Sequence, residues 1–405
     1  MSKEANSALI KKYTKKNLLY RVLNTPEAKL KDIQLVINIG LDPNYRIANN
    51  LTPLEVAALK NNALLGKITE SEENIFKSET EIKDFTRYVK ARLFTELSYS
   101  QLDKGISRSL FTILRQDMAA RVGAEGDKIN EDLLNKINDG KKIDIGEGKT
   151  IEVMPAYYYD RHAIYFVFEC DENNIPTKLS YCDGNANNFP TNIFASGYSS
   201  GEIVFNLDPK KLANLNIEGA ESLAKMKEYL SERLNKTSCR ESRSFVESLS
   251  SQLSSSVEQK IPTKTQVRGN CPFKSFNLAV RACLSKVYPT LVFEQDGKPA
   301  GDGYETFKRY KNGLNQSYLN DLVELGSKEN QDKFYYRDVI NYLEKIILPK
   351  AISKNHTELS ATIKDILKPL TALVSASSVK AQDLSRREIA ENGSILPPAV
   401  PTKLR

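Results

Sequence analysis

The feature that most constrains the fold is a change of hydrophobic period near residue 143. Before it, over 7–135, apolar residues recur at three- and four-residue spacing, which is typical of amphipathic helices. After it come three segments rich in Ile, Val, Tyr and Phe, at 149–160, 162–171 and 177–183, with the polar turn "ENNIP" between the second and the third. The short connections predict an antiparallel meander.

The rest of the chain is expected to pack helices around this sheet. A further strand is predicted at 201–207 and a helix at about 218–236, and helical periodicity returns after 330. The serine-rich segment 248–260 is expected to be a helix end or a loop. The sequence therefore predicts an α+β fold, in which an antiparallel or mixed sheet with packed helices is flanked by helical N- and C-terminal regions.

The expected domain boundaries follow these changes of pattern. With 405 residues, of which 40% are hydrophobic, the chain is long enough to fold as two or three units. The prediction is a helical N-terminal region over 1–95, a sheet-containing domain over 96–300, a helical C-terminal region over 301–384 and a polar, Pro-containing, disordered tail over 385–405.

One segment of the N-terminal region, 37–62, resembles the joint between two ankyrin repeats. Its sequence, "INIGLDPNYRIANNLTPLEVAALKNN", places a Gly-x-Asp-Pro-Asn turn before a Thr-Pro-Leu helix start. Thr52 can cap that helix, and Pro53 can occupy its first position, where a missing N–H costs nothing. Only one clear copy is present, whereas a solenoid needs about three repeats. A degenerate ankyrin module and an ordinary helical hairpin both remain open.

Charge and composition argue against several classes of function. The formal net charge of +7 is spread over the whole chain without a basic block interleaved with aromatics, so nucleic acid binding is not expected. The apolar run "AIYFVF" at 163–168 is too short to span a bilayer, and the N-terminus lacks the apolar core of a signal peptide. Five cysteines without a Cys-x-x-Cys pair argue against a disulfide framework and a zinc site. We expect reduced thiols and no metal.

Cys271 is the candidate nucleophile. It lies directly before Pro272 in "TQVRGNCPFKSFNLAV", at the predicted first turn of a buried helix. A helix N-terminus favours the thiolate form of a cysteine. The alternative is a small buried cysteine that only packs. Such inert positions are expected for the remaining cysteines, which are Cys170, Cys182, Cys239 and Cys283.

A nucleophilic thiol usually needs an imidazole as general base, and the chain has two histidines. His356 lies in the polar segment "SKNHTELS", where a surface position is expected. His162 begins the central apolar strand. If the hairpin turns at about residue 173, Asp183 lies across from His162 to within a residue or two. These two are therefore the candidate base and orienting acid. The alternatives are a strand-edge histidine and a turn residue before Gly184.

The order His162, Asp183, Gln266, Cys271 resembles that of the adenain-like and ubiquitin-like-protein proteases, clan CE. In that clan a histidine begins one strand, an acid ends the next, and a glutamine stands a few residues before a cysteine that starts a buried helix. The resemblance covers about 100–290. It implies a cysteine protease-like catalytic domain that needs no cofactor.

The chain departs from the clan's pattern at two positions. Many eukaryotic members have tryptophan after the histidine, where this chain has Ala163, and glycine after the cysteine, where it has Pro272. Because proline has no N–H, the resemblance implies that the oxyanion is met by the Cys271 amide and the Gln266 side chain.

The resemblance implies an isopeptidase that removes ubiquitin or a ubiquitin-like modifier from host proteins through a thioester. It also implies a bacterial effector, delivered into the host cytoplasm by a non-classical route. Two alternatives stay open. One is a protein acetyltransferase of the YopJ-like kind, which uses acetyl-coenzyme A; the other is a non-enzymatic scaffold whose helical N-terminal third binds a partner.

Overall fold

The computed structural model describes residues 51–60, 78–98, 108–122, 128–160, 162–184, 200–263, 271–295, 298–327, 339–353, 357, 360–365 and 367–368. The chain forms two compact units, Met1–Leu319 and Asn320–Arg405. The second unit contains the end of helix α13 (Asp302–Ser327), the π-helical turn η4 (Leu343–Ile347) and helix α15 (Leu348–Ser353).

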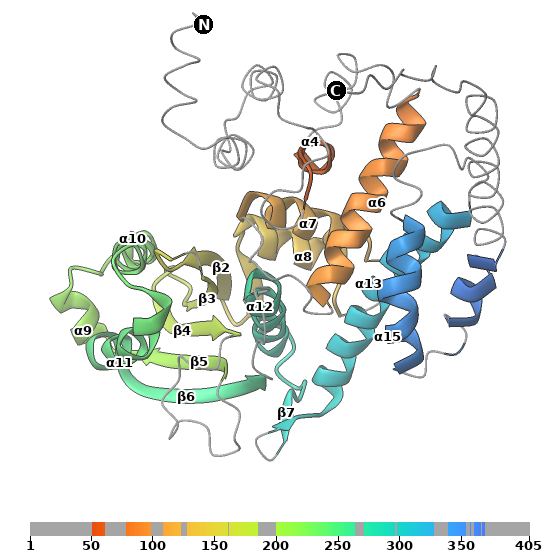
Figure 1. The fold of residues 1–405 in the computed structure, drawn as a ribbon. Coiled ribbons are helices and arrows are strands. Elements are labelled where there is room, and N and C mark those ends of the chain that lie inside the picture. The colour runs from red at the N-terminus through yellow and green to blue at the C-terminus, as the bar shows by residue number, and fades with distance from the viewer. Residues whose placement is uncertain are drawn as a thin grey trace, which may run out of the picture. The chain divides into compact units, whose positions relative to one another are not determined.

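The first unit holds the sheet and most of the helices (Figure 1). Its strands are β1 (Ile143–Gly146), β2 (Lys149–Tyr157), β3 (Ala163–Cys170), β4 (Pro176–Asp183), β5 (Ser200–Leu207), β6 (Ser254–Thr263), β7 (Glu294–Gln295) and β8 (Lys298–Pro299). Its other helices are α4 (Pro53–Lys60), α6 (Glu79–Ser98), α7 (Arg108–Ala120), α8 (Glu131–Asp139), α9 (Pro209–Asn214), α10 (Ser222–Leu234), the 3-10 turn η3 (Cys239–Glu241), α11 (Ser242–Leu253) and α12 (Cys271–Val287).

Strands β1 to β6 form one sheet in chain order, and every neighbouring pair is antiparallel. The predicted α+β class and the meander of β2, β3 and β4 are therefore confirmed. A separate two-stranded sheet pairs β7 with β8.

Helices cover both faces of this sheet, so that every residue of the central strand β3 is buried. Side chains of a strand alternate between the two faces. Ile164, Phe166 and Phe168 pack into one apolar cluster with α10 and α11. Tyr165 points to the other face, where its ring meets Phe276 of α12. Figure 1 shows α10 and α11 on one side of the strands and α12 on the other.

The turn between β3 and β4 fixes the register of the central hairpin. The Asp171 carboxylate accepts hydrogen bonds from the backbone N–H groups of Asn173 and Ile175, at 3.0 and 2.8 Å. Asn174 adopts a left-handed conformation with φ 62°, which asparagine tolerates better than most residues. The chain thus reverses at the position that the sequence predicts.

The serine-rich segment 248–260 is only partly a helix end. Helix α11 ends at Leu253, as one expectation had it, but residues from Ser254 onward form strand β6 instead of a loop. Serine is not among the residue types that favour strands. The backbone of β6 is held by its pairing with β5, an interaction distant in sequence that a local pattern does not contain.

The described part of the N-terminal region is helical, as predicted. The Thr52 hydroxyl accepts a hydrogen bond from the N–H of Glu55, and the Glu55 carboxylate accepts one from the N–H of Thr52. This reciprocal cap starts α4 at Pro53, in agreement with the roles expected of these residues. The rest of the ankyrin-like segment 37–62 lies outside the described residues. Among the described helices, none is both long and apolar enough to cross a membrane.

Candidate active site

His162 directly precedes β3 and is held there by a tight connection from β2. The N–H of Tyr158 donates to the carbonyl of His162 at 3.0 Å, which closes the connection. The N–H of Tyr159 donates to the Thr237 carbonyl, and the N–H of Cys239 donates to the Asp160 carboxylate. These bonds tie the segment before His162 to the turn at the start of η3, and so fix the imidazole at the end of the sheet.

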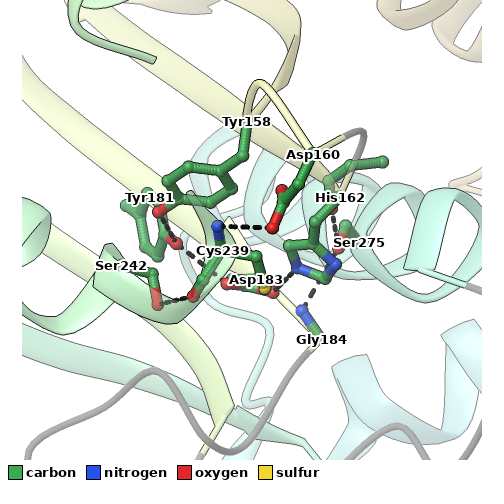
Figure 2. A network of polar contacts seen from close by, with 10 residues as sticks. Tyr158, Asp160, His162, Tyr181, Asp183, Gly184, Cys239, Ser242 and Ser275 are labelled. Atoms are coloured by element: carbon green, nitrogen blue, oxygen red, sulfur yellow. Dashed lines mark hydrogen bonds and ion pairs between the residues drawn. The ribbon is translucent and has the colours of Figure 1, made fainter. Parts of the chain in front are cut away.

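Asp183 ends β4 and is fully buried. The β3–β4 register pairs Tyr165 with Cys182, so Asp183 continues it opposite Ile164, two residues from His162. A separation of two residues leaves both side chains on the same face of the sheet. His162 Nε2 lies 2.8 Å from Asp183 Oδ1 (Figure 2). The structure thus brings together the histidine and the acid that the hairpin predicted as neighbours.

Two buried tyrosines extend this contact into a chain of hydrogen bonds. The Tyr181 hydroxyl donates to Asp183 Oδ2 at 2.8 Å, and the Tyr158 hydroxyl lies 2.8 Å from the Tyr181 oxygen. Because the proton of Tyr181 is given to Asp183, Tyr158 donates to Tyr181. The Tyr158 ring also stacks on His162, with 6.0 Å between ring centroids. Burial and the nearby Asp183 charge raise the pKa of both tyrosines well above 10, so both remain donors.

The sequence analysis did not single out these tyrosines. Both read as apolar residues of strands and contribute to the cluster beneath α10 and α11. A signal was present in the spacing, because Tyr181 stands two residues before Asp183 in the same strand and therefore shares its face.

Cys271 is the first residue of α12 and lies beside the imidazole. Burial disfavours the charged form of His162 and lowers its pKa. The Asp183 carboxylate and the Cys271 side chain favour the charged form through charge and hydrogen bonding, and their effect is larger than that of burial. Together they raise the pKa of His162 from 6.5 to about 11. The imidazole is therefore protonated at neutral pH and interacts with both the carboxylate and the cysteine.

The helix that carries Cys271 is firmly embedded. Its residues from 275 to 284 are all buried, in agreement with the buried helix that the sequence predicts. Phe273 meets Phe94 of α6 edge to face, at 5.5 Å between ring centroids, so the helix also packs against α6.

Three of the other cysteines are buried in surroundings that disfavour the thiolate. Burial raises the pKa of the Cys170 thiol to about 11 and that of Cys283 to about 12, and it raises the pKa of Cys182 well above the ordinary value. Cys239 is half-buried at the start of η3. All five thiols are free.

Gln266 and His356 lie outside the described residues, so the expected oxyanion donor and the second histidine have no structural placement here. Within the described ranges, no group of three or more His, Cys, Asp or Glu side chains is arranged to hold a metal ion. Comparison of the chain with protein-family models and with curated proteins gives no match.

Proposed function

We propose that the chain is a cysteine isopeptidase of the clan CE type, which removes ubiquitin or a ubiquitin-like modifier from proteins. Cys271 is the nucleophile, His162 the general base and Asp183 the acid that orients it. The observation that carries the proposal is the buried His162 imidazole, which is bonded to Asp183 at 2.8 Å and has its pKa raised by both Asp183 and Cys271.

In the acylation step, the Cys271 sulfur, whose proton His162 holds, attacks the carbonyl carbon of the isopeptide bond. The π electrons of the carbonyl move to its oxygen, which becomes an oxyanion. When the intermediate collapses, the C–N bond breaks and the His162 imidazolium gives its proton to the leaving lysine amine. The products are a free amine and a thioester between Cys271 and the modifier.

In the deacylation step, His162 takes a proton from water, and the oxygen of that water attacks the thioester carbon. The C–S bond then breaks, which returns the Cys271 thiolate and the protonated imidazole and releases the modifier as a carboxylic acid, which loses its proton to solvent. Asp183 remains ionised throughout and holds the ring through Nε2. Gln266 and the Cys271 amide are the proposed oxyanion donors, because Pro272 has no N–H to offer.

The fold and the sequence resemblance support different parts of this proposal. An antiparallel sheet with a cysteine at the start of a buried helix is the arrangement that the clan resemblance implies. The three-residue contact supports thiol chemistry in general. The choice of a ubiquitin-like modifier as substrate rests on the resemblance alone.

A panel of ubiquitin-like modifiers, each with an electrophile at its C-terminus, tests the proposal. We expect at least one probe to form a covalent adduct, mapped by peptide mass spectrometry to Cys271. The adduct should be lost in Cys271→Ala and kept in Cys239→Ala, a matched control at the half-buried thiol.

A second arm replaces the probes with acetyl-coenzyme A. If every modifier probe is ignored and Cys271 becomes acetylated, the protein is an acetyltransferase and the isopeptidase proposal fails. If neither reagent modifies Cys271, the protein has no thiol catalysis of either kind.

A further inference from the structure

A serine on the nucleophile's helix joins the two strands that carry the histidine and the acid. Ser275 lies one turn after Cys271 in α12 and is fully buried. Its hydroxyl donates to the carbonyl oxygen of Ala163 at 3.0 Å, and it accepts a hydrogen bond from the N–H of Gly184 at 3.2 Å (Figure 2). Ala163 follows His162 in the chain, and Gly184 follows Asp183.

The register of the sheet explains why a hydroxyl is needed at this place. The paired residues of β3 and β4 end with Tyr165 and Cys182, and two steps further the same register sets Ala163 opposite Gly184. The carbonyl of the first and the N–H of the second are bridged by the Ser275 hydroxyl. A side chain of α12 therefore completes the hydrogen bonding between the ends of β3 and β4, beside His162 and Asp183.

Gly184 permits this close approach of strand and helix. A Cβ atom at this position would lie 2.8 Å from the Cβ of Lys274, which is closer than two such atoms approach in proteins. Because Lys274 Cβ is fixed to the helix backbone, any side chain at 184 would push the end of β4 away from the first turn of α12. Such a shift would also lengthen the bond from Gly184 to Ser275.

We propose that Ser275 is a positioning residue, whose hydroxyl holds Cys271 within reach of His162 by fixing the first turn of α12 to both strand ends. The assignment of Cys271 and His162 as nucleophile and base is that of the proposed function, on which this inference rests. Misplacement of reacting groups by about 1 Å can cost about 100-fold in rate, so a bridge that fixes three segments at once has a direct effect on the thiol.

The test measures the rate at which iodoacetamide alkylates Cys271 between pH 5 and 10, in wild type, Ser275→Ala and His162→Ala. Trypsin cleavage after Lys274 separates Cys271 from position 275, so peptide mass spectrometry reads this thiol alone. In Ser275→Ala we expect a rate at pH 7 that is roughly 10- to 100-fold lower, with the pH profile moved toward higher pH as in His162→Ala.

The chain offers a matched control in Ser180, a fully buried serine of β4. Its hydroxyl has no hydrogen-bond partner among the described residues. Ser180→Ala removes the same kind of atom, a buried serine hydroxyl, from the neighbouring strand β4 and should leave the alkylation profile unchanged. If Ser275→Ala does not fold by circular dichroism, Ser275→Cys serves instead, because a thiol fills the site but bonds more weakly.

The outcomes separate this inference from the proposed function. If His162→Ala leaves the alkylation rate of Cys271 at its wild-type value, the proposed function is contradicted. If the alkylation rate depends on His162 but the Ser275 variant keeps the wild-type pH profile, only the positioning role is overturned. This holds even if that variant is less stable. An equal effect in Ser180→Ala overturns it too, because the loss would then follow from removing any buried serine hydroxyl near the site.

Discussion

Replacing Tyr181 with phenylalanine removes one oxygen atom from the centre of the hydrogen-bond chain. The ring remains, so its packing against Phe166 and Phe245 in the apolar cluster is kept. Two partners lose their bonds: Asp183 Oδ2 loses a donor at 2.8 Å, and the Tyr158 hydroxyl loses an acceptor at 2.8 Å. Both are buried, so water does not readily replace the missing oxygen.

The expected cost follows from the character of the two bonds. A hydrogen bond to a charged group contributes about 1.5–3 kcal/mol, and a bond between neutral groups contributes about 0.5–1.5 kcal/mol. Tyr181→Phe should therefore lower the free energy of unfolding by about 2–4 kcal/mol. Tyr158→Phe, which removes only the neutral bond, should cost about 1 kcal/mol, and the double variant should cost less than the sum.

Urea unfolding followed by far-UV circular dichroism measures these costs, since the chain has no tryptophan for fluorescence. Tyr310→Phe is the matched control, because the buried Tyr310 hydroxyl has no hydrogen-bond partner among the described residues. We expect that control to be neutral or slightly stabilising. If Tyr181→Phe is as stable as wild type, or costs no more than the control, the tyrosine chain does not support Asp183 and the reasoning is refuted.

Three further predictions concern the site. Asp183→Asn should retain roughly 10- to 100-fold more activity than His162→Ala, because an orienting acid contributes less than the base, and equal losses in a steady-state assay would contradict this order. Gly184→Ala should cost about 1–3 kcal/mol in urea unfolding because its Cβ would overlap Lys274, whereas a neutral result would show that α12 can move. The folded pKa of His162 is raised from 6.5 to about 11, so its stabilising effect should be complete below pH 6.5 and disappear as the pH rises toward 11. Unfolding free energies against pH should show this decline in wild type and a smaller one in Asp183→Asn.

The strands of the sheet were predictable because their signals are local. Residues 164–168 are a continuous run of β-branched and aromatic side chains, and the turn at Asp171 fixes how the next strand returns. The contact of His162 with Asp183 follows from that turn, since register carries over along an antiparallel pair. Both inferences need only neighbouring segments of sequence.

The remaining features depend on interactions between distant segments. Ser254 begins a strand because β5 supplies its hydrogen-bond partners, and Ser275 bridges Ala163 and Gly184 across more than ninety residues of chain. A serine in a helix and a tyrosine in a strand each have many ordinary uses. Their roles become specific only when the fold sets a hydroxyl against a particular acceptor, as with Tyr181 and Asp183.

Hydrolysis of a modifier that carries a fluorophore amide at its C-terminus tests the central claim most directly. The account predicts turnover by the wild-type chain and none by Cys271→Ala or His162→Ala, with the circular dichroism spectrum of both variants unchanged. Both residues stand at the ends of elements, and neither belongs to the apolar cluster of the sheet. Wild-type turnover by either folded variant would contradict the assignment of nucleophile and base.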